Sequence, residues 1–225
     1  MRCLITSRRL LVSIIGSVLL LLPCLAIAGQ GEIPSYRVAR DLFWNQLYPH
    51  GTWTLYCGQR VRGPGIAVDV DHIYPVDWMV AAAGCHTRSQ CQASNERFNR
   101  MEADLHNMYA SLAVIYGARP KRAFGMISGE DHLVRPSCDF EHDLLRHVSE
   151  PRPLARGNLA RSIFYMHTEY NLPIPPDMVM LLKRWNREDP PSRHELMRNH
   201  RIEAIQGTRN RFIDMPALGE AIKAP

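Results

Sequence analysis

The sequence predicts an α+β protein that is mainly helical, with a small amount of strand in its first third. Residues 52–70 are rich in Thr, Trp, Tyr and Val and are interrupted by glycine and proline, which is typical of short strands and turns. Most of the remaining chain repeats apolar residues with the 3.6-residue period of amphipathic helices. The expected architecture is a few strands surrounded and followed by helices.

Local signals predict the first elements. Apolar residues at helical spacing, with Ser35 at the N-cap position, predict a helix over 35–47. Two short strands joined by a turn are expected within 52–72, the second of them over 66–72. Pro75 then opens a short helix.

Three apolar stripes with helical spacing predict helices in the rest of the chain. Pro120 ends the first of these segments. Ser192, with Glu195 three residues later, has the form of a capping box for a last helix that runs toward Gln206. The stripes consist of Phe98, Met101, Leu105 and Leu112, of Leu159, Ile163, Met166 and Tyr170, and of Met178, Leu181, Leu182 and Trp185.

The first 28 residues have the three parts of a secretory signal peptide. Arg2, Arg8 and Arg9 precede a 13-residue apolar run, too short to span a bilayer, and an Ala-Ile-Ala end. We expect export and cleavage after Ala28, with an uncleaved anchor as the alternative, and a single domain over 29–225. Because the segment holds three of the 27 basic residues and none of the 22 acidic ones, the rest of the chain carries +2 rather than +5. The net charge alone therefore does not indicate a polyanion-binding protein.

Cysteine usage agrees with export. Beyond residue 28 the number of cysteines is even, and an oxidising compartment favours disulfides. Of three possible pairings we expect Cys85 with Cys91, because a seven-residue loop closes easily, and hence Cys57 with Cys138. A zinc site of four cysteines is the alternative, although no Cys-x-x-Cys spacing is present to begin one.

Spacing excludes several enzyme classes. His194-Glu195 is followed by His200 rather than by a histidine three residues after the glutamate, so the zinc-protease helix motif is absent. Residues 125–129 do not form a Gly-x-Ser-x-Gly nucleophile elbow. The glycine-rich lysine loop that cradles nucleotide phosphates is absent as well.

The expected second strand carries the clearest chemistry. Val68 and Val70 alternate with Asp69 and Asp71, so both carboxylates leave one face, and His72 leaves the other. Carboxylate oxygens suit Mg²⁺, and a neighbouring imidazole can take a proton from water. The strand is therefore either part of a hydrolytic site or the approach to an ordinary turn.

Ordered sequence blocks recur along most of the chain. They are Leu55-Tyr56-Cys57-Gly58, Asp71-His72-Ile73-Tyr74-Pro75 with Trp78, Met101-Glu102-Ala103-Asp104-Leu105-His106-Asn107, Ala123-Phe124-Gly125, Cys138-Asp139-Phe140-Glu141, Ala155-Arg156-Gly157-Asn158-Leu159-Ala160-Arg161 with Phe164-Tyr165-Met166, and Arg201-Ile202 with Gln206-Gly207 and Arg209-Asn210. In this order they resemble the endonuclease I family of periplasmic and secreted DNases, whose active site is of the ββα-metal (His-Me finger) type. The resemblance covers about residues 56–213.

The resemblance implies a small ββα-metal core within the helical domain and assigns roles to three residues. His72 stands where the family has the general base that deprotonates the attacking water. Asp71 stands where the family has a glutamate bound to Mg²⁺, for which Mn²⁺ or Ca²⁺ are the expected substitutes. Arg88 matches an arginine that steadies the scissile phosphate.

One position departs from the family pattern. The second metal ligand of the family, an asparagine, falls on Tyr116, and a neutral tyrosine is a poor Mg²⁺ ligand. Asp69 and Asn107 are the candidate substitutes, with a solvated acid and a helix cap as their alternative roles. The departure predicts a metal site that is weakened on one side.

Clustered basic residues predict contacts to a nucleic-acid backbone. The main expected contacts are Arg119, Lys121 and Arg122, while plain solvation is the alternative for the others. His106 and Asp104 are expected to be hydrogen-bonded scaffold groups. The remaining basic candidates are Arg156, Arg161, Arg193, Arg198, Arg201, Arg209 and Arg211.

Taken with the resemblance, these patterns predict an exported, Mg²⁺-dependent and largely sequence-nonspecific endonuclease that cuts DNA, with RNA as a second substrate. A monomer that is periplasmic or secreted is expected. The alternative, motivated by Tyr116, is a catalytically weakened relative that binds nucleic acid or acts as an interaction module. A secreted structural domain without a nucleic-acid role is the third hypothesis.

Overall fold

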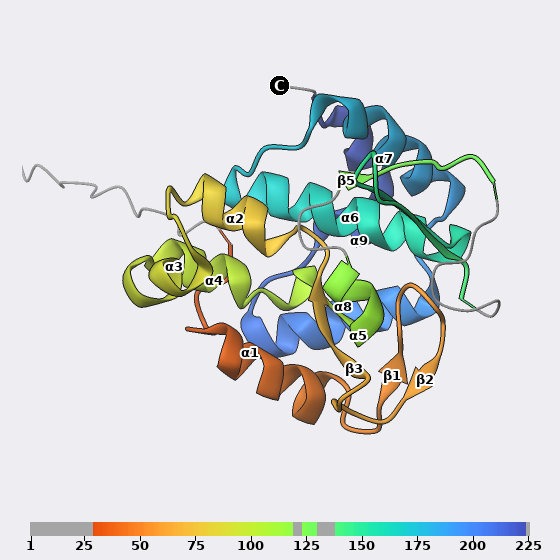
Figure 1. The fold of residues 1–225 in the computed structure, drawn as a ribbon. Helices are drawn as coiled ribbons and strands as arrows, with labels where there is room; N and C mark the ends of the chain where they lie inside the picture. Colours follow the sequence, from red (N-terminus) through yellow and green to blue (C-terminus); the bar gives the residue numbers. More distant parts are fainter. Residues whose placement is uncertain (1–28, 119–122, 130–137, 224–225) are drawn as a thin grey trace, which may run out of the picture.

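Helices surround small β-sheets in the computed structural model, which describes residues 29–118, 123–129 and 138–223 (Figure 1). The expected signal peptide lies outside the described residues. The helices are α1 Tyr36–Leu42, α2 Val76–Ala82, α3 Arg88–Ser94, α4 Glu96–Glu102, α5 Ala113–Ala118, α6 Pro153–Tyr170, α7 Pro176–Glu188, α8 Arg193–Gln206 and α9 Arg211–Asp214, with the shorter or π-type turns η1 Phe43–Leu47, η2 Leu105–Asn107 and η3 Pro216–Ala221. The strands are β1 Thr52–Trp53, β2 Arg60–Val61, β3 Val68–His72, β4 Met108–Leu112, β5 Ala123–Phe124, β6 Phe140–Asp143 and β7 Val148–Pro151. This confirms the predicted α+β class.

The pair formed by β3 and β4 is antiparallel and is followed directly by α5. Its register places Asp71 opposite Tyr109 and His72 opposite Met108. The prediction of a helix through residues 98–112 is wrong beyond α4. All five residues of β4 are buried, so the strand has no polar face to give the alternation by which strands are recognised.

The strands before residue 72 also differ from the prediction. β1 pairs with β2, and the strand expected over 66–72 is β3, whose partner lies some forty residues later in the chain. Only two residues of β1 and two of β2 pair, because the chain between them turns through Gly58 at a positive φ of 60°.

Local helix signals are confirmed at several ends. The Ser35 hydroxyl accepts a hydrogen bond from the Val38 amide at the start of α1, and the Ser192 hydroxyl accepts one from the Glu195 amide at the start of α8. The helix at Pro75 is α2, and the apolar stripes after residue 155 belong to α6 and α7. Helices α1 and α8 therefore begin where side-chain capping alone places them.

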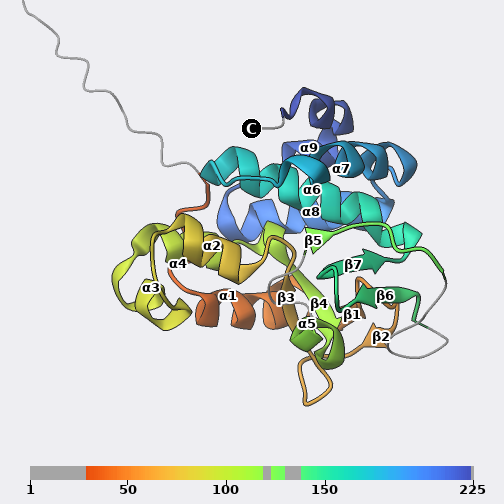
Figure 2. The same ribbon diagram turned by 45° about the horizontal axis from the view of Figure 1, so that its top comes forward.

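Two hydrophobic clusters enclose the β3–β4 pair. One joins α1 and η1 to Met108 and Ala110 of β4, and the other packs Tyr109 and Leu112 against α6 and α7. Figures 1 and 2 show β3 between α1 on one side and α6 on the other.

No helix within the described ranges is long and apolar enough to cross a membrane.

Both predicted disulfides are present. Cys57 is bonded to Cys138, and Cys85 is bonded to Cys91. The first links the loop after β1 to the segment before β6, across 81 residues, and the second closes the short segment that leads into α3. The alternative of a zinc site is excluded, because a bonded cysteine has no thiolate to offer a metal.

Candidate active site

His72 is the last residue of β3 and is buried, with 5% of its surface exposed. Its Nε2 lies 2.7 Å from the backbone oxygen of Glu102 at the end of α4. A carbonyl oxygen can only accept, so Nε2 carries the proton and the lone pair of the neutral ring is on Nδ1. Burial lowers the pKa of His72, which favours that neutral form near pH 7. The ring is therefore held as a proton acceptor.

The aspartates of β3 are engaged differently. Tyr56 donates a hydrogen bond of 2.9 Å to Oδ2 of Asp71. Asp69 is held from two sides by Arg40 of α1, with Nε–Oδ1 and Nη2–Oδ2 distances of 2.8 and 3.2 Å. A bidentate ion pair of this kind neutralises the Asp69 carboxylate. Among the described contacts, Asp71 is thus tied to Tyr56 and Asp69 to Arg40.

Arg88 is the first residue of α3 and lies next to His72. Its Nε is 2.5 Å from Oε1 of Glu102, the residue whose backbone oxygen holds the His72 ring. Its guanidinium carbon lies 4.9 Å from the centre of the Tyr36 ring, which is itself 5.3 Å from the His72 ring. The side chain of Arg88 is 43% exposed, whereas the His72 ring beneath it is buried.

Two local features of the sequence, a helix cap and a disulfide, hold Arg88 at the start of α3. The Thr87 hydroxyl accepts a hydrogen bond from the Gln90 amide and caps α3, and the Cys85–Cys91 bond closes the chain around that cap. Capping fixes the first turn of a helix, and the disulfide limits how far this turn can move. Both of these constraints act on Arg88.

Tyr36 and Glu102 are site residues that the sequence analysis did not identify. Glu102 has no exposed surface, and its carboxylate accepts hydrogen bonds from Arg88 and from Gln92. Burial, and then the charge of Asp69, raise the pKa of Tyr36 to about 12. The available signal was that Glu102 is an acid next to the apolar residue Met101, which predicts a buried acid with a dedicated partner.

Asn107, Asp104 and His106 support the site from the interior. The Asn107 amide accepts a 2.6 Å hydrogen bond from the Tyr74 amide and donates to the Tyr74 oxygen, which ties the chain after β3 to the start of β4. Asp104 accepts hydrogen bonds from both Tyr165 and Tyr170. The scaffold roles expected for Asp104 and His106 are confirmed, because His106 is also fully buried and bonded through Nε2 to the Thr208 oxygen.

The remaining metal and nucleic-acid predictions fall largely outside the described residues. The side chain of Tyr116 and the residues Arg119, Lys121 and Arg122 are not among them. Within the described ranges, no group of three or more His, Cys, Asp or Glu side chains is placed to hold an ion. Asp71, the predicted ligand that precedes His72 on β3, accepts a hydrogen bond from Tyr56.

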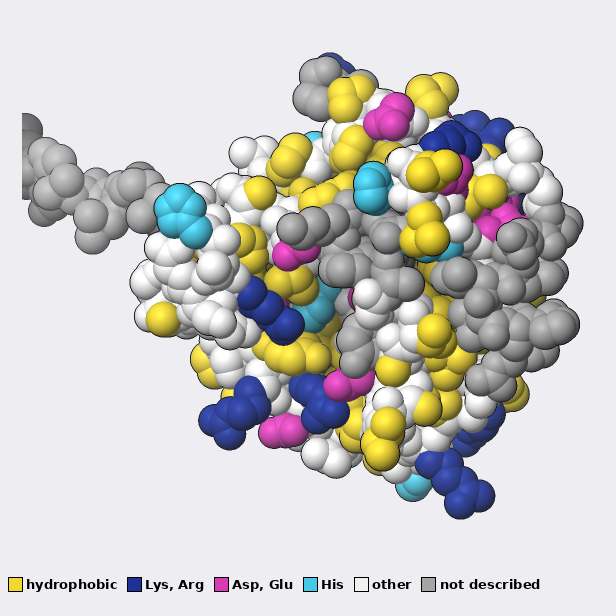
Figure 3. Space-filling view, viewed as in Figure 1, with side chains coloured by type: hydrophobic (Ala, Val, Ile, Leu, Met, Phe, Trp, Pro, Cys, Tyr) yellow, Lys and Arg dark blue, Asp and Glu magenta, His cyan; other side chains and the backbone are white. Residues whose placement is uncertain are grey.

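Basic side chains gather near the histidine site. In Figure 3, Lys and Arg side chains lie beside and below a histidine in a hollow left of the centre, over the region of α1, α3 and β3. Arg37 and Arg88 are the exposed arginines of α1 and α3, and Arg40 is partly exposed. A phosphate that approached this edge would meet positive charge.

Several other arginines that the sequence suggested as phosphate contacts are buried or paired with acids. Arg161 and Arg198 are buried, and Arg161 pairs with Glu195 at 2.6–2.7 Å. Arg156 lies 2.6 Å from Glu150. Arg209 is half-buried and Arg211 is exposed, and both are paired with acids on neighbouring helices. Helical periodicity predicted polar, solvent-facing positions for these arginines. In the structure, polar residues of α8 pack against α6 instead.

His72 at the end of β3 and Arg88 at the start of α3 both contact Glu102, and Asp71 precedes His72 on the strand. The sequence profile of the endonuclease I family matches residues 38–217. The chain therefore belongs to the endonuclease I family, as the resemblance predicted.

Similar proteins agree with this assignment. An extracellular deoxyribonuclease of Aeromonas hydrophila is 29% identical, over 85% of this chain and 95% of its own length. A periplasmic deoxyribonuclease of the same species is 27% identical, over 81% of this chain and 86% of its own. An endonuclease-1 of Buchnera aphidicola is 25% identical, over 80% of this chain and 73% of its own length.

Proposed function

We propose that this chain is an exported endonuclease that hydrolyses phosphodiester bonds of DNA, with RNA as a second substrate, and has His72 as its general base. The observation that carries the proposal is the contact of His72 Nε2 with the Glu102 backbone oxygen, because it puts the lone pair on Nδ1. Membership of the endonuclease I family supports the substrate class.

In the proposed reaction, Nδ1 of His72 accepts a proton from a water molecule as the water oxygen forms a bond to phosphorus. The bond between phosphorus and the leaving oxygen breaks, and negative charge grows on the phosphate oxygens. Nε of Arg88 is occupied by Glu102, so its terminal nitrogens, on a 43% exposed side chain, are the donors for that charge. Glu102 thus orients both the base and the cation.

The donor set of this edge fits a hard divalent ion. Mg²⁺ needs oxygen ligands and keeps several waters, so one carboxylate together with substrate phosphate oxygens is sufficient. Asp71 would hold the ion, and Tyr56 orients its carboxylate. When bound, Mg²⁺, or Mn²⁺ or Ca²⁺ in its place, supplies positive charge for the phosphate oxygens.

Export is proposed from the N-terminal segment of the sequence. It has the charged, apolar and small-residue parts of a signal peptide, and two similar proteins are named extracellular and periplasmic deoxyribonucleases. The two disulfides agree with an oxidising compartment. The processed chain would act in the periplasm or outside the cell.

A second function is favoured by one residue. By the resemblance, the family's second metal ligand falls on Tyr116, which would weaken the metal site. The chain would then bind nucleic acid at the basic edge around Arg88, or act as an interaction module, without cutting efficiently.

A plasmid-nicking assay separates the two functions. The processed chain should convert supercoiled plasmid to nicked circles with Mg²⁺ or Mn²⁺ and not with EDTA, and His72→Ala should lower this rate by about 10²–10⁴-fold while still binding the plasmid. A chain that binds plasmid but leaves it supercoiled with every metal would favour the second function. Cleavage that His72→Ala does not reduce would reject the proposed base.

A further inference from the structure

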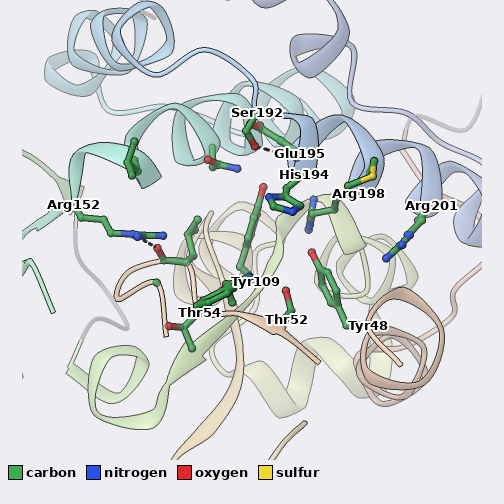
Figure 4. Close-up of a pocket in the computed structure, with 16 residues that line it drawn as sticks. Tyr48, Thr52, Thr54, Tyr109, Arg152, Ser192, His194, Glu195, Arg198 and Arg201 are labelled. Atoms are coloured by element: carbon green, nitrogen blue, oxygen red, sulfur yellow. Dashed lines mark hydrogen bonds between the residues drawn. The ribbon is translucent and has the colours of Figure 1, made fainter. Parts of the chain in front are cut away.

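We propose that a second site, built around Arg198, binds the phosphate of a nucleotide. The cavity has a volume of about 430 Å³ and lies between the β1–β2 region, β4 and α8 (Figure 4). Neither His72, Asp71 nor Arg88 lines it, so it is separate from the proposed catalytic edge.

Arg198 is a buried cation whose hydrogen bonds are incomplete. Only 5% of its surface is exposed, and Nη2 donates to the backbone oxygens of Leu105 and Met108 at 2.5 and 2.7 Å. Its Nε and Nη1 are buried and have no hydrogen-bond partner among the described residues. Guanidinium groups stay charged in proteins, and leaving their donors unpaired in the interior is costly.

Tyr109 adds a second incomplete group at the same place. Its ring centre lies 4.0 Å from the guanidinium carbon of Arg198, and its buried hydroxyl also lacks a hydrogen-bond partner within the described ranges. Figure 4 shows the Tyr48 hydroxyl pointing toward Arg198 and the Tyr109 hydroxyl pointing toward Ser192 and His194. Unpaired N–H donors and hydroxyls that line one cavity are what an anion with several acceptor oxygens would satisfy.

The surrounding charge favours an anion. Arg152 and Arg201 also line the cavity, and Glu195 is its only acid among the described lining residues. The Glu195 carboxylate is already neutralised, because Nε and Nη2 of Arg161 bind its two oxygens at 2.7 and 2.6 Å. Among the described lining residues, Arg198 therefore has no carboxylate of its own, and its guanidinium is contacted by the Tyr48 hydroxyl and the Tyr109 ring.

Size and shape extend the inference from an anion to a nucleotide. A cavity of about 430 Å³ is much larger than an isolated phosphate needs and is in the usual range for small organic ligands. Trp53 lines it and is 54% exposed, which makes its ring available for stacking on a base. The nucleoside part of the inference rests on the proposed nuclease function, whereas the anion part rests on Arg198 and Tyr109 alone.

Isothermal titration calorimetry in EDTA tests the site without any cleavage. The ligands are deoxyadenosine 5′-monophosphate, deoxyadenosine, inorganic phosphate, and a four-nucleotide DNA with and without a 5′-phosphate. We expect the monophosphate to bind about tenfold or more tightly than the nucleoside, the size of one charged hydrogen bond. The two DNA ligands show whether a free nucleotide or a strand end is preferred.

Variants assign the binding to this cavity. Tyr109→Phe removes a hydroxyl that has no partner in the described contacts, so it should weaken nucleotide binding severalfold without lowering the melting temperature. Arg201→Gln should weaken binding, whereas Arg184→Gln, the same charge change on α7 away from the cavity, should not. His72→Ala should bind the nucleotide as the parent chain does.

Several outcomes would overturn the proposal. The anion site is rejected if the monophosphate and the nucleoside bind equally or neither binds, or if Tyr109→Phe and Arg201→Gln leave the affinity unchanged. Inorganic phosphate that binds as tightly as the monophosphate rejects the nucleotide assignment. A loss of binding in His72→Ala would place the ligand in the catalytic site instead. Plasmid nicking is measured separately, so a failure here is distinct from a failure of the nuclease proposal.

Discussion

At the scale of single residues, the chemistry depends on which nitrogen of one imidazole carries the proton. The Glu102 oxygen decides this for His72, and the Glu102 side chain positions Arg88 at the same time. One buried residue therefore couples the proton acceptor to the phosphate-binding cation. A change at Glu102 should disturb both, whereas a change at His72 should remove only the base.

Replacing His72 with alanine should lower the cleavage rate by about 10²–10⁴-fold, the usual contribution of a general base. Far-ultraviolet circular dichroism and the melting temperature establish that the variant is folded. Supercoiled-plasmid kinetics then give the rate. A folded His72→Ala chain with the parent rate would show that the base is another group.

His106 should make stability depend on pH. Burial, and then the charge of Arg198, lower its pKa to about 3, whereas an unfolded chain has a histidine of ordinary pKa, about 6.5. Between these values the unfolded chain binds a proton that the folded chain does not, so the free energy of unfolding should fall as pH falls from about 6.5 toward 3. His72 acts in the same direction.

Denaturant unfolding of the parent chain and of His106→Gln, at pH 7 and pH 5, measures the effect of His106. The variant should lose less stability than the parent between these two pH values, and the other titrating groups cancel in the comparison. Equal losses in the two chains would contradict a buried neutral His106.

At the scale of elements, the site is assembled from segments that local constraints hold. The cap at Thr87 and the Cys85–Cys91 bond fix α3, which carries Arg88. Pairing with β4 fixes β3, which carries His72, and α5 continues directly from β4. Each of these elements is short, so its position depends on its ends rather than on its own length.

Removing one disulfide should affect catalysis through α3. The Cys85→Ala/Cys91→Ala variant loses a bond that closes a seven-residue loop, worth about 2.4 kcal/mol on the loop-entropy model, and should also lose activity because Arg88 is less constrained. Cys57→Ala/Cys138→Ala is the comparison, with a larger predicted cost of about 4.5 kcal/mol and no direct link to Arg88. The melting temperature of each variant is measured first. The cleavage rate of each is then measured at a temperature below both melting transitions. Equal activity losses in the two variants would reject a specific role of the short loop.

The residue at position 116 of α5 should decide the strength of the metal site. Tyr116→Asn should raise Mg²⁺-dependent cleavage by restoring an amide oxygen, and adding Asp71→Glu should raise it further. The two effects should be non-additive, because both side chains would hold one ion. Cleavage is measured over a range of Mg²⁺ concentrations for both single variants and the double variant.

The control for position 116 is the melting temperature of the same variants. A fall in stability with unchanged, negligible cleavage would show that Tyr116 is a core side chain rather than an altered ligand position. That result would favour the nucleic-acid-binding module over the nuclease.

At the scale of the whole molecule, buried polar groups join the helical layers. Arg161 of α6 and Glu195 of α8 form an ion pair with essentially no exposed side-chain surface, and Arg161 also donates to Asn186 of α7. The neighbouring Gly157 is required for this arrangement, since a Cβ there would lie 1.9 Å from the backbone oxygen of Asp189 and 2.8 Å from the Arg161 guanidinium nitrogens. The pair therefore fixes how α6 and α8 meet, and with it one wall of the Arg198 cavity.

Breaking this pair should be costly. Arg161→Met leaves the Glu195 carboxylate buried without its partner and should destabilise the protein by roughly 3–5 kcal/mol, while Arg161→Met with Glu195→Leu should recover much of the loss. Arg187→Met, which removes a pair with Glu220 on the surface, is the matched control and should cost about 1 kcal/mol or less. Denaturant midpoints give the comparison, and equal costs for Arg161→Met and Arg187→Met would contradict the burial argument.

The sequence by itself determined the features that depend on neighbouring residues. The caps at Ser35 and Ser192, the helix after Pro75 and the short Cys85–Cys91 loop are all set within a few residues of chain. Family membership was also readable, because the ordered blocks that contain His72 and Glu102 span most of the chain. Asp71 and His72 were placed on opposite faces of a strand by alternation alone.

Only the tertiary structure decided what depends on contacts across the chain. β4 is buried on both faces and so lacks the polar alternation of a strand, and the partner of His72 lies 30 residues away. Arg161 and Arg198 read as surface cations because periodicity reports which face of a helix is polar, not what packs on that face. Burial of a charge depends on a partner from another helix, and no local pattern in the sequence records that partner.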